Sequence, residues 1–208
     1  MFEHVWFQIN FSAFSQGMTS KRELRDSEWK VKKVPWNHAP YGPTNVDLVL
    51  RRLPGTRWVP WVVVAPSAIM HRTDPSKQGL GLYSAQNLVP KSGFVGRYTG
   101  EIVGLFPNRK QALESAECKR RLSNNNCTLM TLKTAEAGVF LVDGENAGAP
   151  FLQRINDPHG TRCKSNITCT QGGWMHVERP ISAFDTGKDA QSNIGAELRL
   201  DYGSGWWW

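Results

Sequence analysis

The chain has 208 residues, of which 25 are Lys or Arg and 18 are Asp or Glu. This length fits one domain, with or without an extension, and allows a core that needs neither disulfides nor a structural metal. A hydrophobic fraction of 40% and a charged fraction of 21% exclude wholesale disorder. Since no apolar run approaches the roughly 20 residues that cross a bilayer, we expect a soluble protein without membrane contact.

The net charge of +7 is spread along the chain rather than gathered in one tail. Its densest clusters are short: Lys30–Lys33, Arg51–Arg52 and Lys119–Arg121. A basic surface attracts acidic partners such as nucleic acid, but clusters of this length are typical of an ordinary solvated surface.

The four cysteines include no Cys-x-x-Cys pair, so the sequence predicts no zinc site and no metal of another kind. The first residues lack the basic and apolar segments of a secretory signal. We therefore expect free thiols in a reducing, intracellular compartment.

Residues 1–65 are expected to be an N-terminal extension of unknown role, and residues 66–208 the main domain. The extension is rich in Trp, and its stretch from Pro35 to Pro43 holds three prolines, which predicts no regular element. Its Trp rings suit packing onto the main domain, although an exposed partner-binding face is the alternative.

From Trp61 onward, short apolar runs between Gly and Pro predict strands. One stretch differs: Asn108 to Leu122 places apolar residues on one helical face, with Asn108 as the cap. The sequence therefore predicts a β-rich domain with one helix and excludes a doubly wound nucleotide-binding fold. The predicted strands are Trp61–Ala65, Leu80–Ala85, Gly93–Tyr98, Val139–Val142, Ile167–Thr170, Trp174–Val177 and Leu198–Tyr202.

Three short patterns could carry chemistry, and each is weak alone. The Gly-x-Gly at Gly79–Gly81 permits close backbone approach to a ligand, but a simple turn explains it equally well. The polar run Arg154–His159 follows an apolar pair and needs hydrogen-bonding partners or a ligand. Asp201-Tyr202-Gly203 places a phenol at the end of a strand, shortly before Trp206–Trp208.

Taken in order and with their spacing, these patterns resemble the SET-domain protein lysine methyltransferases. The resemblance covers residues 66–207, through Gly79-x-Gly-Leu82, Gly96-Arg-Tyr-Thr-Gly-Glu-Ile102, Arg154-Ile-Asn156 with the later Asn166, and Gly195-x-Glu-Leu-x-x-Asp-Tyr-Gly203. It implies a mainly β, β-rich α+β fold of short strands in several small sheets, with a C-terminal pseudoknot and one inserted helix.

The resemblance also implies an activity, S-adenosylmethionine-dependent methyl transfer to a protein lysine, with histone tails as the family's usual substrates. Tyr202 and Tyr98 would be the catalytic residues. The cofactor would be bound by Leu80, Gly81, Tyr98, Arg154, Asn156, Asp157, Asn166 and Trp207.

Two departures and two alternatives accompany this hypothesis. Asp157 stands where the family has His, which puts cofactor affinity in question, and the cysteine-rich flanking segments of many members are absent. The alternatives are a catalytically impaired SET-like module that binds chromatin or protein, and a basic nucleic-acid binder with stacking Trp rings. The basic clusters and aromatics are not interleaved, which argues against the second. Nuclear location is implied by the resemblance alone, and oligomeric state is left open.

Overall fold

A computed structural model describes residues 28–38, 42–52, 54–69, 79–90, 93–123, 128–134, 138–144, 151–159, 161–184 and 196–203. Strands dominate these segments, and two short α-helices and two 3-10 turns accompany them. The strands are β1 (Glu28–His38), β2 (Gly42–Arg52), β3 (Val59–Pro66), β4 (Leu80–Ser84), β5 (Phe94–Arg97), β6 (Glu101–Phe106), β7 (Leu129–Lys133), β8 (Val139–Asp143), β9 (Ile167–Thr170), β10 (Trp174–Val177) and β11 (Glu197–Leu198); the helices are α2 (Arg109–Glu114) and α3 (Ala116–Ser123), and the 3-10 turns are η2 (Leu152–Arg154) and η3 (Gln171–Gly173).

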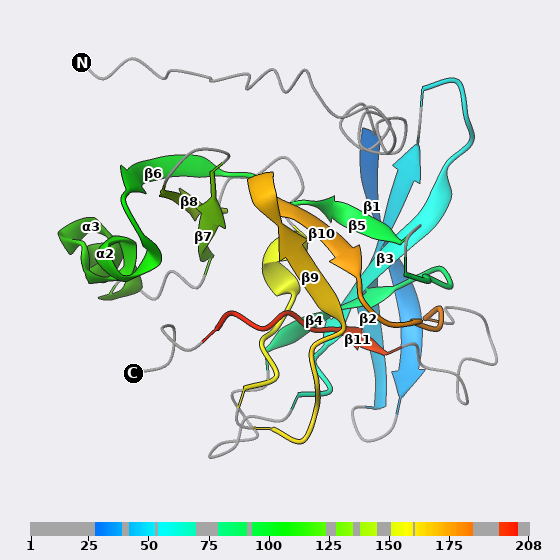
Figure 1. The fold of residues 1–208 in the computed structure, drawn as a ribbon. Helices are drawn as coiled ribbons and strands as arrows, with labels where there is room; N and C mark the ends of the chain where they lie inside the picture. Colours follow the sequence, from blue (N-terminus) through cyan, green and yellow to red (C-terminus); the bar gives the residue numbers. More distant parts are fainter. Residues whose placement is uncertain are drawn as a thin grey trace.

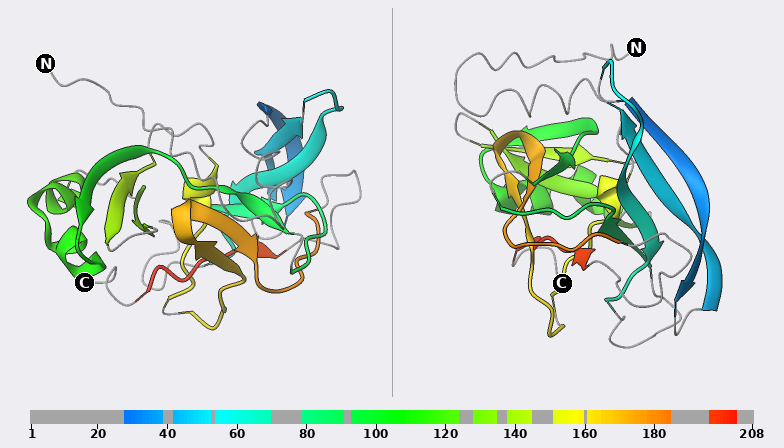
Figure 2. Two further views of the ribbon diagram at one scale, coloured as in Figure 1. Left: turned by 45° about the horizontal axis from the view of Figure 1, so that its top comes forward. Right: turned by 90° about the vertical axis from the view of Figure 1, so that its right-hand side faces the viewer.

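The strands form three antiparallel sheets, in the orders β1-β2-β3-β4-β11, β5-β10-β9 and β6-β8-β7. In Figure 1 the third sheet and its two helices lie on the left, β1 to β3 lie on the right, and β9 and β10 lie between them. The left view of Figure 2 shows the same separation. Among the described segments, no helix has the length and apolar character that a membrane span requires.

The β-rich fold of several small sheets that the SET resemblance implies is confirmed. The main core joins side chains of all three sheets, including Val62, Leu82, Val95, Val142 and Met175, each at most 4% exposed. The three sheets therefore share one hydrophobic interior.

The C-terminal segment, residues 196–203, is enclosed between two earlier parts of the chain. Asn156 and Arg199 form one parallel bridge, and Ile167 and Leu200 form another. The segment crosses the middle of the molecule beside the yellow loop in Figure 1. This crossing is the arrangement that the predicted pseudoknot requires, and it places Tyr202 inside the fold rather than on a free tail.

The predicted helix from Asn108 to Leu122 is divided in two at Ser115, which has an extended backbone. Asn108 caps α2 as predicted, since its side chain accepts from Gln111 N. The Ser115 hydroxyl donates to Ala112 O and accepts from Cys118 N, so one side chain ends α2 and caps α3. A serine that bonds to nearby backbone in this way competes with a continuous helix.

The prediction that Pro35 to Pro43 forms no regular element is wrong at both ends, because β1 runs to His38 and β2 begins at Gly42. β1 is the edge strand of its sheet. An edge strand tolerates the missing N–H of Pro35, since only one of its sides is paired.

Two Trp rings of β1 pack as expected onto the later part of the chain. Trp36 is 4% exposed and lies 5.4 Å from the Phe184 ring, and Trp29 meets Phe151 edge-on at 4.9 Å. The predicted boundary at residue 65 falls within β3, so the division into an extension and a SET domain stays a prediction.

Candidate active site

A buried polar cluster joins β4, η2 and β11. The Glu197 carboxylate, 2% exposed, accepts from the Ser67 hydroxyl at 2.7 Å, from Ala68 N at 2.8 Å and from the Asn156 amide at 2.8 Å. Asn156 Nδ2 also contacts the Leu80 carbonyl at 3.1 Å. A buried carboxylate needs such donors because no water solvates it. The cluster therefore fixes Asn156 beside the Gly-x-Gly turn.

Gly81 is required by this cluster. A Cβ at residue 81 would lie 2.2 Å from Glu197 Oε1, closer than any real Cβ contact. The space that the glycine leaves is thus taken by a side chain of the protein itself. The prediction that Gly81 binds cofactor is not tested by this contact, which concerns its Cα rather than its carbonyl.

The turn next to this cluster is open. A Cβ at Gly79 would meet no atom within 4 Å, and Leu80 is 43% exposed. Arg154, in η2, is exposed; its backbone N–H donates to the Phe151 carbonyl at 3.0 Å, but its side chain makes no hydrogen bond or ion pair to another described residue. Open backbone and a guanidinium that no described residue pairs suit a ligand with a carboxylate, such as the amino-acid end of S-adenosylmethionine.

Asn166 is committed to the fold. Its side chain, 5% exposed, donates to Glu197 O at 2.9 Å and accepts from Arg199 N at 2.7 Å. These bonds hold the C-terminal segment against β9. This side chain thus contributes to the pseudoknot, and the predicted cofactor role of Asn166 stays a prediction.

The Asp157 side chain also accepts hydrogen bonds from the backbone of this chain. Its two carboxylate oxygens accept from His159 N at 2.6 Å and from Tyr202 N at 2.5 Å. The Tyr202 hydroxyl donates to the Ile155 carbonyl. The run from Ile155 to Asp157 thus holds Tyr202 at both its backbone and its ring, and the predicted cofactor role of Asp157 stays a prediction.

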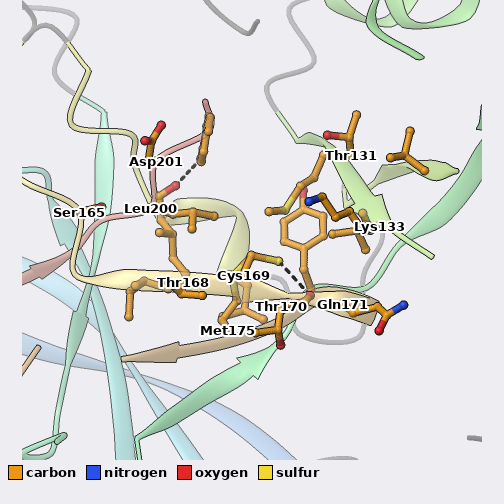
Figure 3. A pocket seen from close by; sticks show the side chains of 18 of the residues that line it. Thr131, Lys133, Ser165, Thr168, Cys169, Thr170, Gln171, Met175, Leu200 and Asp201 are labelled. Atoms are coloured by element: carbon orange, nitrogen blue, oxygen red, sulfur yellow. Dashed lines mark hydrogen bonds between the residues drawn. The ribbon is translucent and has the colours of Figure 1, made fainter. Parts of the chain in front are cut away.

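Tyr98 and Tyr202 line one cavity of about 410 Å³, between β7, β9 and the C-terminal segment. Figure 3 shows Asp201 and Leu200 on one side of it, Thr131 and Lys133 on the other, and Cys169 and Met175 below. The structure therefore brings both predicted catalytic residues to one place. Trp207 lies outside the described residues.

Burial and the neighbouring Tyr202 and Asp143 side chains raise the pKa of Tyr98 far above its usual range. Its hydroxyl donates to the Thr128 carbonyl. A phenol held in this state keeps its proton at neutral pH, which excludes Tyr98 as a general base. Burial also raises the pKa of the Cys169 thiol to about 12, so this cavity residue is neutral too.

Sequence reasoning missed Arg109, Glu197 and Ser67. Arg109 begins α2 and donates to the Tyr202 carbonyl across the cavity. Glu197 lies within a motif that the sequence identified, so its place was available, but its contact with Gly81 joins residues 116 positions apart and has no local signal. Ser67 directly follows β3, and no sequence motif includes it.

Comparisons with known proteins give a distant likeness to solved structures. No protein-family model matches the sequence, and no curated protein matches it either. Among solved structures, the chain is similar to the crystal structure of CpSET8 from Cryptosporidium, with 20% sequence identity and a TM-score of 0.41. The match covers 69% of this chain and 57% of that one, so the chain corresponds to little more than half of that structure. Function has to be argued from the side chains of this chain.

Proposed function

We propose that this chain is an S-adenosylmethionine-dependent protein lysine N-methyltransferase. One observation carries the proposal: two adjacent residues, Ile155 and Asn156, contact the two parts of the site, which are the cavity and the open turn at Gly79 and Leu80. Ile155 accepts from the Tyr202 hydroxyl in the cavity, and Asn156 contacts the Leu80 carbonyl at the open turn. The segment Ile155–Asn156 is thus a wall with the cavity on one side and the open turn on the other. Methyl transfer requires close alignment of nucleophile and donor, and a shared wall fixes the two binding places relative to each other.

The residues at the open turn fit the cofactor in part. Arg154 and the backbone of Gly79 and Leu80 would bind it, with Asn156 fixing the Leu80 carbonyl. When bound, S-adenosylmethionine supplies a methyl group on a sulfonium centre. Cofactor binding at this turn needs neither side-chain oxygen of Asp157, because both oxygens accept hydrogen bonds from backbone N–H groups.

The cavity side of the wall suits a lysine. Leu132, Ile167 and Met175 form an apolar part of its lining, and such a surface disfavours an ammonium ion by desolvation. A neutral amine is the form that attacks a methyl group. Tyr202 orients that amine through its phenol oxygen, which can accept a hydrogen bond from N–H. Because Tyr98 keeps its own proton, the lysine ammonium gives up its proton to another base or to solvent before the amine attacks.

The substrate class is part of the proposal. We propose a protein lysine, with core histone tails as the first candidates and the nucleus as the matching compartment. Recombinant core histones are therefore the first substrates to test.

Two measurements test the proposal. Calorimetric titration with S-adenosylmethionine should give saturable binding with one site per chain, and Arg154→Ala should weaken it. Tyr202→Phe should bind the cofactor as well as wild type but transfer methyl groups much more slowly. Saturable binding without transfer in the wild type would point to the impaired binding module, and full activity of Tyr202→Phe would remove the catalytic role of Tyr202.

A further inference from the structure

Two side chains of opposite charge bind the backbone of Tyr202, one at its N–H and the other at its carbonyl. The Asp157 carboxylate accepts from Tyr202 N at 2.5 Å, and the Arg109 guanidinium donates to Tyr202 O. Charge-assisted hydrogen bonds of this kind are about twice as strong as neutral ones. The backbone of Tyr202 thus lies between an anion from the η2 loop and a cation from α2.

Arg109 fits closely against the following residue. A Cβ at residue 203 would lie 2.4 Å from Arg109 Nη1, and Gly203 has φ +76°, in the left-handed region. Glycine is the residue that adopts this conformation without strain and leaves room for the guanidinium. The sequence Tyr202-Gly203 therefore provides the surface against which Arg109 packs.

Partial burial lowers the pKa of the Arg109 guanidinium, and the nearby Asp201 and Asp157 carboxylates oppose this effect by attracting its positive charge. Arg109 is also the first residue of α2, directly after the Asn108 cap. The cap fixes the backbone at the start of α2, and so fixes the Cα from which the Arg109 side chain extends. The position of α2 and the position of Tyr202 are therefore linked.

We propose that Arg109 and Asp157 are positioning residues, which together set the place of the Tyr202 ring in the cavity and link it to the α2–α3 segment. This inference rests on the proposed methyltransferase function, and it assigns Asp157 a role in place of the cofactor contact made by the family His. Neither residue touches the reacting atoms. Both act through the backbone of Tyr202.

The test compares Arg109→Gln, Arg109→Lys and Asp157→Asn with wild type. The matched control is Lys110→Gln, the next residue of α2, whose side chain is 81% exposed and whose ion pair with Glu114 spans 3.9 Å. For each protein, calorimetry gives the S-adenosylmethionine Kd, and steady-state methylation of core histones, or of the chain itself, gives kcat and KM.

We expect Arg109→Gln to lower kcat by about 10- to 100-fold, since a misplacement of about 1 Å in an aligned reaction has effects of this size. Its cofactor Kd should match wild type, Arg109→Lys should recover part of kcat, and Lys110→Gln should retain all of it. The loss in the Arg109→Gln/Asp157→Asn double variant should be smaller than the product of the single losses, because both residues act on Tyr202.

Each other outcome counts against the inference. An active wild type with full kcat in Arg109→Gln would overturn it and leave the methyltransferase proposal intact. Loss of cofactor binding together with kcat in Arg109→Gln would show a general structural effect and overturn the positioning role. A wild type that transfers no methyl group to histones or to itself would remove the proposed function, and the inference with it.

Discussion

The side chain of Asn156 donates a hydrogen bond to the Glu197 carboxylate over 2.8 Å, across 41 positions of sequence. Glu197 belongs to β11, and Asn156 follows η2, so the bond ties the C-terminal segment to the loop that it crosses. The same carboxylate fills the space left by Gly81. One buried acid thus connects three of the four sequence motifs from which the resemblance was drawn.

Glu197→Gln should destabilise the protein although it preserves the side-chain shape. Ser67, Ala68 N and Asn156 all donate to the carboxylate, so a glutamine NH₂ would face at least one donor. An unsatisfied buried donor costs about 1–3 kcal/mol. Urea denaturation of the two proteins measures the difference. An unchanged unfolding midpoint would show that the cluster contributes little to stability.

Gly81→Ala should destabilise the fold, and Gly79→Ala should not. The added methyl would lie 2.2 Å from Glu197 Oε1 in the first case and would meet nothing within 4 Å in the second. Overpacking of a filled site typically costs about 1–3 kcal/mol. Thermal unfolding of the pair measures this contrast, and equal midpoints for the two variants would contradict it.

The fold class could be predicted from sequence because strand runs such as Ile167–Thr170 and Trp174–Val177 carry local apolar and turn signals. The break at Ser115 could not, because a serine inside a helical pattern either points to solvent or caps, and only the local hydrogen bonds decide. β1 was missed for a different reason. Its proline, Pro35, argues against a central strand, whereas position at the sheet edge is a tertiary property.

The candidate site could also be predicted from the sequence only in part. The motifs place Tyr98 and Tyr202 in the candidate site, and both line one cavity. What each polar side chain contacts was beyond the sequence: Asn166 and Asp157 bond to backbone of this chain, and Arg109 reaches Tyr202 from 93 positions away. Such long-range pairings depend on how the sheets pack, which no local pattern encodes.

Tyr98 should titrate later than an ordinary tyrosine. Burial raises its pKa first, and the nearby Tyr202 and Asp143 side chains add to this. A raised pKa in the folded state means that its contribution to stability is present below the ordinary value near 10 and is lost as pH rises above it. Ultraviolet absorbance during alkaline titration should show one late phenol that is missing in Tyr98→Phe. Identical curves for the two proteins would contradict the shift.

Glu117 should contribute to stability except in strong acid. Hydrogen bonds from Arg120 and then Arg121 hold its pKa at about 2, below the ordinary value of 4.5. A lowered pKa in the folded state gives stability that is present above pH 4.5 and lost as pH falls toward 2. Wild type and Glu117→Gln should therefore converge in urea midpoint across this window. Parallel curves from pH 5 to pH 2 would show that the pairing is not maintained in solution.

Arg121 should contribute more to the free energy of unfolding than its neighbour Arg120. Arg121 pairs with Asp143, whose side chain is 3% exposed, and also with Glu101 and Glu117. Removal of one partner leaves a buried charge, which costs about 3 kcal/mol. Arg121→Met should therefore lower the unfolding free energy strongly, and Arg120→Met, at an exposed pair, only slightly. Equal losses in the two variants would argue that Asp143 finds another partner.

The most direct test of the proposed function is intact-mass spectrometry after incubation with S-adenosylmethionine and recombinant core histones. The proposal predicts that a histone, or the chain itself, gains mass in whole methyl units with wild type and gains almost none with Tyr202→Phe. Tyr202 lines the cavity, and Asp157 and Arg109 hold its backbone, so loss of the hydroxyl alone should affect transfer rather than folding. A wild type that binds S-adenosylmethionine but leaves every protein unmethylated would contradict the assignment as a methyltransferase.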